Sequence, residues 1–304
     1  MLDITRIDHI SVAVPELGPQ IELLEGLFGF RKRDEWVQEE EHHRGVSFHV
    51  PGSSGVDWEV LAPYGEGSYI QSFLDSPLGP GLHHIAIAVR DVLAAVDELR
   101  RLGIDPWDGG AQEPSGQRRE TYIHPSRGGN GFLFQLFGAS ARVLSPGADR
   151  SPPFPPAEHT LGIKAVNHLA HAHPDREELA AWYERVLGMR VVHRSPEVPS
   201  SDFVTLVLEA PTGQMRLEIL QPTRPESFVQ RFIADRGPAM HHVTFEVEEW
   251  GRAVAACEHH GVPTFGEREG VTAGARWNEA FIHPRHTGGV LTQLFWQERP
   301  GIWI

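Results

Sequence analysis

Four short stretches of the chain alternate apolar residues with polar or small ones, and each contains a histidine followed by a branched apolar residue. These histidines are His9, His84, His168 and His242. In the second stretch, Ile85, Ile87 and Val89 alternate with an imidazole and two alanines. A period of two residues places successive side chains on opposite faces of a β-strand. Each stretch therefore predicts a strand with one apolar face and one face that carries an imidazole.

The pattern occurs twice along the chain. His9, Glu59, His84, His124 and Gln135 return as His168, Glu218, His242, His283 and Gln293. Every pair is separated by 158 or 159 residues. A register held over such a distance indicates a tandem duplication. We predict two domains, 1–140 and 161–304, joined by a linker over 141–160, where prolines are frequent and no periodic pattern is found.

Each half divides again into two modules, at about 5–75, 80–138, 163–232 and 239–297. Helical spacing of apolar residues predicts helices at about 17–28, 91–103, 175–188 and 250–261, with Asp91 and Asp175 as N-terminal caps. Further strands are predicted near 46–50, 58–61, 69–73, 120–123 and 132–137. The expected architecture is α+β, with four βαβββ modules in two tandem domains.

Polar residues interrupt the apolar runs of the predicted strands at matched places. Glu59 lies between Trp58 and Val60, and Gln135 lies between two apolar residues in the same way. If the apolar side chains pack on the helices, the polar ones face the other side of the sheet. Two imidazoles, one carboxylate and one amide oxygen would then converge in each half. The two sets are His9, Glu59, His84 and Gln135, and His168, Glu218, His242 and Gln293.

This ligand set is suited to a divalent metal ion such as Zn, Co, Ni, Mn or Fe. Four protein ligands on an octahedral ion would leave two adjacent positions for water or for a substrate that chelates through two oxygens. The sequence leaves open whether one half or both are active. It also leaves open whether His9 and Glu59 pair with His84 and Gln135 or, by swapping of modules, with His242 and Gln293.

Composition narrows the choice of partners. The formal net charge of −14 argues against a surface for nucleic acid or an anionic membrane. Neither a signal-peptide pattern nor an apolar run of membrane-spanning length is present, and Cys257 is the single cysteine. We expect a cytoplasmic protein that binds a small molecule and can form a homodimer.

The residues described so far resemble the vicinal oxygen chelate superfamily, which includes glyoxalase I, methylmalonyl-CoA epimerase and the extradiol dioxygenases. The stretches 8–14, 81–91 and 281–291 are most similar to methylmalonyl-CoA epimerase. The resemblance implies paired βαβββ modules that form U-shaped mixed sheets. It also implies that the two sets of four residues are the metal ligands.

Two departures from the family bear on the reaction. The last-strand ligand, which in epimerase and glyoxalase is usually a glutamate that also transfers a proton, is Gln135 in one half and Gln293 in the other. An amide does not accept a proton at neutral pH. No carboxylate lies near Phe48 or Leu206, where the second base of the epimerase is expected. The remaining candidates are Glu59 and Glu218, the matched pair Glu120 and Glu279, or a metal-bound hydroxide.

Three functions remain in consideration. The leading hypothesis is an isomerase, epimerase or glyoxalase-type lyase that acts through a metal-stabilised enediolate. The second is a ring-cleaving Fe(II) dioxygenase, since two histidines and one carboxylate satisfy a facial triad. Those enzymes, however, place the carboxylate on the last strand. The third is a small-molecule-binding protein without catalysis.

Overall fold

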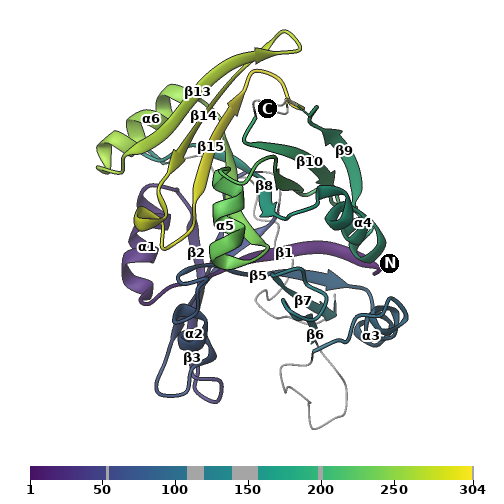
Figure 1. The fold of residues 1–304 in the computed structure, drawn as a ribbon. Coiled ribbons are helices and arrows are strands. Elements are labelled where there is room, and N and C mark those ends of the chain that lie inside the picture. The colour runs from purple at the N-terminus through teal and green to yellow at the C-terminus, as the bar shows by residue number, and fades with distance from the viewer. Residues whose placement is uncertain (53–54, 108–119, 139–156, 198–200, 303–304) are drawn as a thin grey trace. The chain divides into compact units, whose positions relative to one another are not determined.

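The computed structural model describes residues 1–52, 55–107, 120–138, 157–197 and 201–302 of the 304-residue chain (Figure 1). Most of the predicted linker, 141–160, lies outside the described residues, so its structure stays a prediction. The first half contains β1 (Ile4–Ala13), α1 (Leu17–Gly26), β2 (Arg31–Gln38), β3 (His43–His49), β4 (Asp57–Pro63), α2 (Tyr69–Leu74), β5 (Gly81–Val89), α3 (Val92–Arg101), β6 (Glu120–Ile123) and β7 (Leu133–Gly138).

The second half repeats this order. It contains β8 (Ile163–Ala172), α4 (Arg176–Leu187), β9 (Arg190–Arg194), β10 (Phe203–Glu209), β11 (Arg216–Pro222), α5 (Phe228–Arg236), β12 (Ala239–Val247), α6 (Trp250–His259), β13 (Thr264–Thr272), β14 (Ala275–Ile282), the 3-10 turn η1 (Pro284–His286) and β15 (Thr292–Gln297). Figure 1 shows β13 and β14 as a long hairpin beside β15. Three modules have the order βαβββ, and in the module that begins at β5 the stretch before β6 lies outside the described residues.

The strands form one mixed sheet from each half. The first has the order β2-β3-β4-β1-β5-β7-β6, and the second has the order β13-β14-β15-β12-β8-β11-β10-β9. β5 runs parallel to β7, and β12 runs parallel to β15, whereas the hairpins are antiparallel. The predicted α+β class with two tandem domains is confirmed. Because β1 lies beside β5, the modules pair within each half and not by swapping.

Helices α3 and α4 begin where the sequence places a capping aspartate. The Asp91 carboxylate accepts hydrogen bonds from the backbone N–H groups of Leu93 and Ala94 at the start of α3. Asp175 does the same for α4, which ends at Gly188 in the left-handed conformation that glycine adopts without strain. Both predicted caps are therefore confirmed.

The strand predicted at 69–73 is wrong, because these residues form helix α2. Ile70, Phe73 and Leu74 have the i, i+3, i+4 spacing of a helix face, and they pack against Ala13 and Leu61. Strand β2 was not located in the sequence. It is an edge strand whose residues are mostly exposed, so it lacks the alternation that identified the others.

By proximity of Cα atoms the chain divides into two compact units. One comprises Met1–Ile10, His83–Asp149 and Leu169–His241, and the other comprises Ser11–Leu82, Arg150–His168 and His242–Ile304. Each unit has its own aromatic core. Phe134 packs on Trp182 and Tyr183 in the first unit, and Phe30 packs on Trp58 and Phe245 in the second. Each core joins residues from both halves of the sequence, and the predicted domain bounds stay a prediction.

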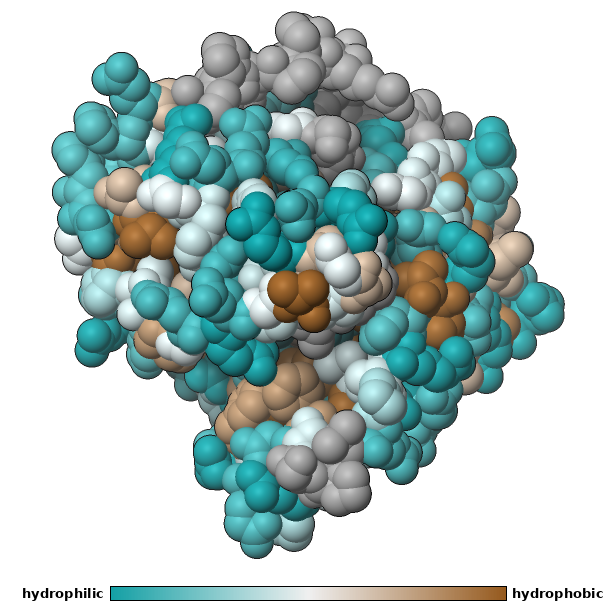
Figure 2. Space-filling view, turned by 90° about the horizontal axis from the view of Figure 1, so that it is seen from above, coloured by the Kyte–Doolittle hydropathy of each residue, from teal (hydrophilic) through white to brown (hydrophobic). Residues whose placement is uncertain are grey.

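The face of the molecule drawn in Figure 2 is largely polar. The face drawn in Figure 2 shows hydrophobic residues in small separate groups among hydrophilic ones. Among the described residues, no helix is long and apolar enough to cross a membrane.

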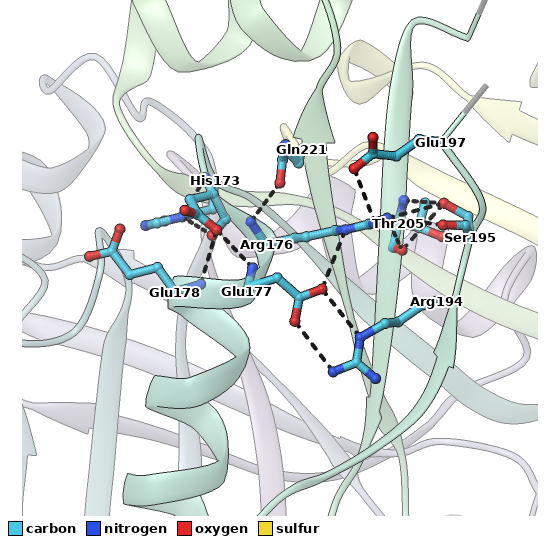
Figure 3. A network of polar contacts seen from close by, with 10 residues as sticks. His173, Arg176, Glu177, Glu178, Arg194, Ser195, Glu197, Thr205 and Gln221 are labelled. Atoms are coloured by element: carbon cyan, nitrogen blue, oxygen red, sulfur yellow. Dashed lines mark hydrogen bonds and ion pairs between the residues drawn. The ribbon is translucent and has the colours of Figure 1, made fainter. Parts of the chain in front are cut away.

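A buried arginine fixes the start of α4 against strands β9 and β10 (Figure 3). The Arg176 guanidinium donates to the backbone carbonyls of Ser195, at 3.1 Å, and Thr205, at 3.0 Å, and only 8% of this residue is exposed. Its backbone N–H donates to the side chain of Gln221. Arg194 lies in the same network but is half exposed, and it pairs with the exposed Glu177.

We predict that Arg176→Ala lowers the free energy of unfolding by about 2–4 kcal/mol, because the carbonyls of Ser195 and Thr205 each lose a charged donor and the buried side chain loses its packing. Arg194→Ala is the matched control and should cost less than about 1 kcal/mol, since exposed ion pairs contribute little. Urea denaturation of the three proteins measures both values. Equal losses for the two variants would contradict this account of the network.

Candidate metal centre

Each half brings two histidines and one glutamate together. Among the described residues, the ligand atoms of His9, Glu59 and His84 lie within 4.8 Å of one another, and those of His168, Glu218 and His242 do the same. These are six of the eight residues that the sequence pattern predicted. The first set is buried throughout, and the second is buried except for the half-buried Glu218.

The carboxylate of Asp8 holds the imidazole of His9 in its orientation. His9 Nδ1 donates to Asp8 Oδ1 over 3.0 Å, because a carboxylate only accepts. The Nε2 atom is then the nitrogen suited to coordination. The ring of His9 meets the ring of His84 edge to face, with centroids 5.5 Å apart. His84 Nδ1 lies 2.8 Å from His83 Nδ1, so this ring too is held through its Nδ1 side.

Asp8 carries the charge that this arrangement needs. Burial raises the pKa of its carboxyl, but the hydrogen bond from His9 and the nearby charges of His9 and Arg6 outweigh burial. The pKa of Asp8 is therefore held below its ordinary value. An anion that accepts from an imidazole makes the other ring nitrogen a better ligand for a metal.

Gln135 adds an amide oxygen beside the first triad. It pairs with Ala86, two residues beyond His84, across the parallel strands β5 and β7. Its Nε2 donates to Glu120 Oε2, at 2.7 Å, and to the Tyr122 hydroxyl, at 3.3 Å. Because the carboxylate requires the NH2 group on its side, the amide oxygen must face the other way. Within the described residues this buried oxygen has no hydrogen-bond partner, as expected for a metal ligand or a substrate contact.

The second triad lies on the equivalent strands β8, β11 and β12, but the residues around it differ. The rings of His168 and His242 have centroids 5.6 Å apart. His168 Nδ1 lies 2.9 Å from Asn167 Oδ1, so a neutral amide stands where the first half has a carboxylate. The Asn167 Nδ2 atom donates to Glu246. Gln293 Nε2 donates to Glu279 Oε2 over 2.6 Å, and this fully buried carboxylate also pairs with Arg268.

The alternative base pair, Glu120 and Glu279, is brought close to the glutamines in both halves. Each carboxylate holds the amide nitrogen of the last-strand glutamine. These glutamates therefore act on the amide and not directly on the triad. The histidines at the turns behave as the sequence indicates, since the side chains of His124 and His283 accept backbone N–H groups two residues later.

Two features of the site were missed in the sequence. The residue before the first ligand, Asp8 or Asn167, was not recognised as its support, although its type and position were visible. Thr244 was also missed, and its hydroxyl lies 2.9 Å from His168 Nε2 and donates to Gln293 Oε1 over 2.6 Å. The signal was the difference between Thr244 and Ala86 at equivalent positions of the repeat.

The donor set fits a divalent metal in the first half. The ligands would be two imidazole nitrogens, one carboxylate oxygen and the Gln135 amide oxygen, which faces away from Glu120. Among them, only the carboxylate carries a charge. No thiolate takes part, since Cys257 is buried on α6 and burial raises its pKa to about 11.

The chain is similar in sequence to several characterised enzymes. Human mitochondrial methylmalonyl-CoA epimerase is 32% identical over 131 residues, covering 42% of this chain and 72% of its own length. The ethylmalonyl-CoA/methylmalonyl-CoA epimerase of Cereibacter sphaeroides is 30% identical over 134 residues and is covered over 97% of its length. The 4-hydroxyphenylpyruvate dioxygenase of Hordeum vulgare is 34% identical over 112 residues, covering 32% of this chain and 24% of its own.

Among solved structures, a mutant of 4-hydroxymandelate synthase from Streptomyces coelicolor superposes with a TM-score of 0.73 at 14% identity. This match covers 100% of this chain and 95% of the synthase chain, which shows a shared two-domain fold. The model of the glyoxalase/bleomycin resistance protein/dioxygenase superfamily matches residues 8–122 and again residues 167–281. Because the two matches together cover most of the chain and include both triads, the chain belongs to the glyoxalase/bleomycin resistance protein/dioxygenase superfamily.

Proposed function

We propose that this protein is a divalent-metal-dependent enzyme that moves a proton beside a carbonyl group, as an isomerase, epimerase or glyoxalase-type lyase. The observation that carries the proposal is the buried cluster of His9, Glu59 and His84, whose ligand atoms lie within 4.8 Å of one another. The substrate would be a small acid, ketone or thioester with two neighbouring oxygens. The epimerase relatives, which align at about 30% identity, support this class of reaction.

The metal would be Zn, Co, Ni, Mn or Fe, since imidazole and carboxylate ligands suit all of these ions. Such an ion would polarise the substrate carbonyl and stabilise the negative charge that develops when the neighbouring proton leaves. His9, Glu59 and His84 would hold it, with Gln135 as a fourth ligand. Asp8 would keep the His9 ring in place, and Glu120 would keep the amide of Gln135 turned toward the site.

The proton would be taken by Glu59 or, in the second half, by Glu218. The hydrogen bonds argue against Glu120 and Glu279 as direct bases, while a metal-bound hydroxide stays an alternative. Glu120 is bound to the Gln135 amide nitrogen, and Glu279 is fully buried between Gln293 and Arg268. Both oxygens of Glu279 are thus engaged, Oε2 by the Gln293 amide and Oε1 by the Arg268 guanidinium, so neither is placed to accept a proton from a substrate. Glu59 is 5% exposed and belongs to the triad itself.

A ring-cleaving Fe(II) dioxygenase is the second candidate. Two histidines and one carboxylate form the facial set that such iron sites use, and dioxygenases are among the relatives. The last-strand residue, however, is an amide whose nitrogen is held by Glu120, so the carboxylate stands on β4 instead. A binding protein without catalysis is the third candidate, and an intact ligand set argues against it. A homodimer and a cytoplasmic location stay predictions.

We predict that metal-loaded protein exchanges the α-proton of a branched acyl thioester or a 2-hydroxy ketone for deuterium in deuterated water, observed by proton NMR. Removal of the metal by a chelator should abolish the exchange, and re-addition should restore it. Glu59→Gln should slow it by at least about 100-fold, the usual effect of losing a general base. The exposed Glu66→Gln is the matched control and should leave the rate unchanged.

Oxygen electrode measurements with catechol and hydroquinone substrates distinguish the second candidate. The proposal expects no substrate-dependent oxygen uptake by the Fe(II)-loaded protein. Oxygen uptake without α-proton exchange would overturn the isomerase proposal and favour the dioxygenase.

We predict that Asp8→Asn weakens metal binding by about 10- to 100-fold, because the imidazole of His9 loses the anion behind it. Competition with a fluorescent chelator measures the dissociation constant. Asp3→Asn is the matched control, since Asp3 is an exposed carboxylate paired with Arg90. An unchanged affinity for Asp8→Asn would contradict the role assigned to this carboxylate.

A further inference from the structure

The two ligand sets differ at the residue that lies two positions after the second histidine. In the second half this residue is Thr244, whose hydroxyl donates to Gln293 Oε1 over 2.6 Å and lies 2.9 Å from His168 Nε2. One side chain thus engages two of the four ligand atoms. A cation could bind both atoms only after these hydrogen bonds were broken, which costs binding free energy.

The first half has no such hydroxyl. Ala86 takes the equivalent place and pairs with Gln135, just as Thr244 pairs with Gln293. Within the described residues the Gln135 amide oxygen is buried and has no hydrogen-bond partner. The same strand register therefore presents an available oxygen in the first half and an engaged one in the second.

The support behind the first histidine also differs in charge. His9 donates to the Asp8 carboxylate, whereas His168 faces the amide oxygen of Asn167. Each half also has an arginine beside a supporting carboxylate, since Asp8 pairs with Arg6 and Glu279 pairs with Arg268. Behind the first histidine, a carboxylate acceptor makes the imidazole a stronger metal ligand than an amide acceptor does.

A third difference between the halves is that the first half has buried serine hydroxyls beside its ligand residues. Ser47 pairs directly with Glu59 across β3 and β4, so both side chains share one face of the sheet. Ser11 lies two residues after His9 on β1 and shares its face by the same alternation. Both hydroxyls are buried and have no hydrogen-bond partner among the described residues. A buried hydroxyl without a hydrogen-bond partner lowers the stability of the fold unless a ligand or a water molecule bonds to it.

The second half has apolar residues at both places. Val207 pairs with Glu218 as Ser47 pairs with Glu59, and Ala170 replaces Ser11 in the repeat. The first half therefore offers two hydroxyl donors on its ligand face, where a substrate with carbonyl or carboxylate oxygens would accept them. The second half offers none at these positions.

We propose that the first half alone holds the metal and receives the substrate, and that Thr244 keeps the second ligand set closed to the cation. The metal part of this inference is independent of the reaction, whereas the substrate part rests on the proposed function. The second half then serves as a structural copy in which His168 and Gln293 are held by the Thr244 hydroxyl. The substitution Thr244→Ala would remove this hydroxyl and leave the residue that the first half has at the equivalent position, Ala86.

Calorimetric titration of the metal-free protein with Co²⁺ tests the metal part. We expect about one ion per chain for the wild type and for His168→Ala, and none for His9→Ala. Thr244→Ala should gain a second ion or bind the second at least about 10-fold more tightly. Thr244→Ser keeps the hydroxyl and should remain at one ion, which controls for disturbance of the strand. The absorption of bound Co²⁺ gives a second readout.

Each other result overturns the assignment. Two ions on the wild type, or none, would refute it, and so would loss of the ion in His168→Ala but not in His9→Ala. Circular dichroism shows whether each variant is folded. A folded Thr244→Ala variant with unchanged binding would remove Thr244 as the cause of the difference.

Steady-state kinetics with the substrate found by proton exchange test the second part. Ser47→Ala should raise KM by about 3- to 10-fold, as expected for one lost hydrogen bond, with little change in kcat. Its Co²⁺ stoichiometry should stay at one ion. Ser72→Ala on α2 is the matched control, because its hydroxyl makes only a 3.5 Å contact with the backbone carbonyl of Ser68. An unchanged KM for Ser47→Ala would refute the substrate part, while the titration would still decide the metal part.

Discussion

The alternation of side chains along a β-strand is the constraint on which the site depends. Trp58 and Val60 are buried in the core, so Glu59 between them faces the other side of the sheet. The cross-strand register fixes its neighbours, and Ser47 lies directly opposite Glu59. A slip of one residue would turn the carboxylate into the apolar core. The aromatic packing that fixes the register is therefore a condition for any metal binding.

Much of this arrangement could be predicted because alternation and repetition are visible in one sequence. The histidine strands, the caps at Asp91 and Asp175 and the strand that begins at Glu120 all agree with the structure. Elements without a buried stripe were missed or misassigned. Edge strand β2 is polar on both faces, and α2 is so short that its helical spacing was taken for a strand.

Residue types could indicate the ligands but not what holds them. The amide of Gln135 gains a defined direction because Glu120 accepts from its nitrogen, and that contact spans 15 residues and two strands. The role of Thr244 could likewise not be predicted from the sequence. Its position in the repeat was visible, but its effect depends on two hydrogen-bond distances that no spacing rule provides.

The duplicated fold thus combines conserved geometry with different chemistry in its two halves. Both sheets present two histidines and one glutamate in the same order along neighbouring strands. Under the proposed division of roles, small changes around them, a carboxylate in place of an amide and an alanine in place of a threonine, decide which set binds a cation. Both halves still contribute to the aromatic cores, since Phe134 packs on Trp182 and Phe30 packs on Phe245.

The most direct measurement is a crystal structure of the Co²⁺-loaded protein with anomalous scattering recorded at the cobalt absorption edge. The account predicts one strong peak per chain, surrounded by His9, Glu59 and His84, with the amide oxygen of Gln135 turned toward it. A peak between His168 and His242 alone, or no peak at either triad, would contradict the account.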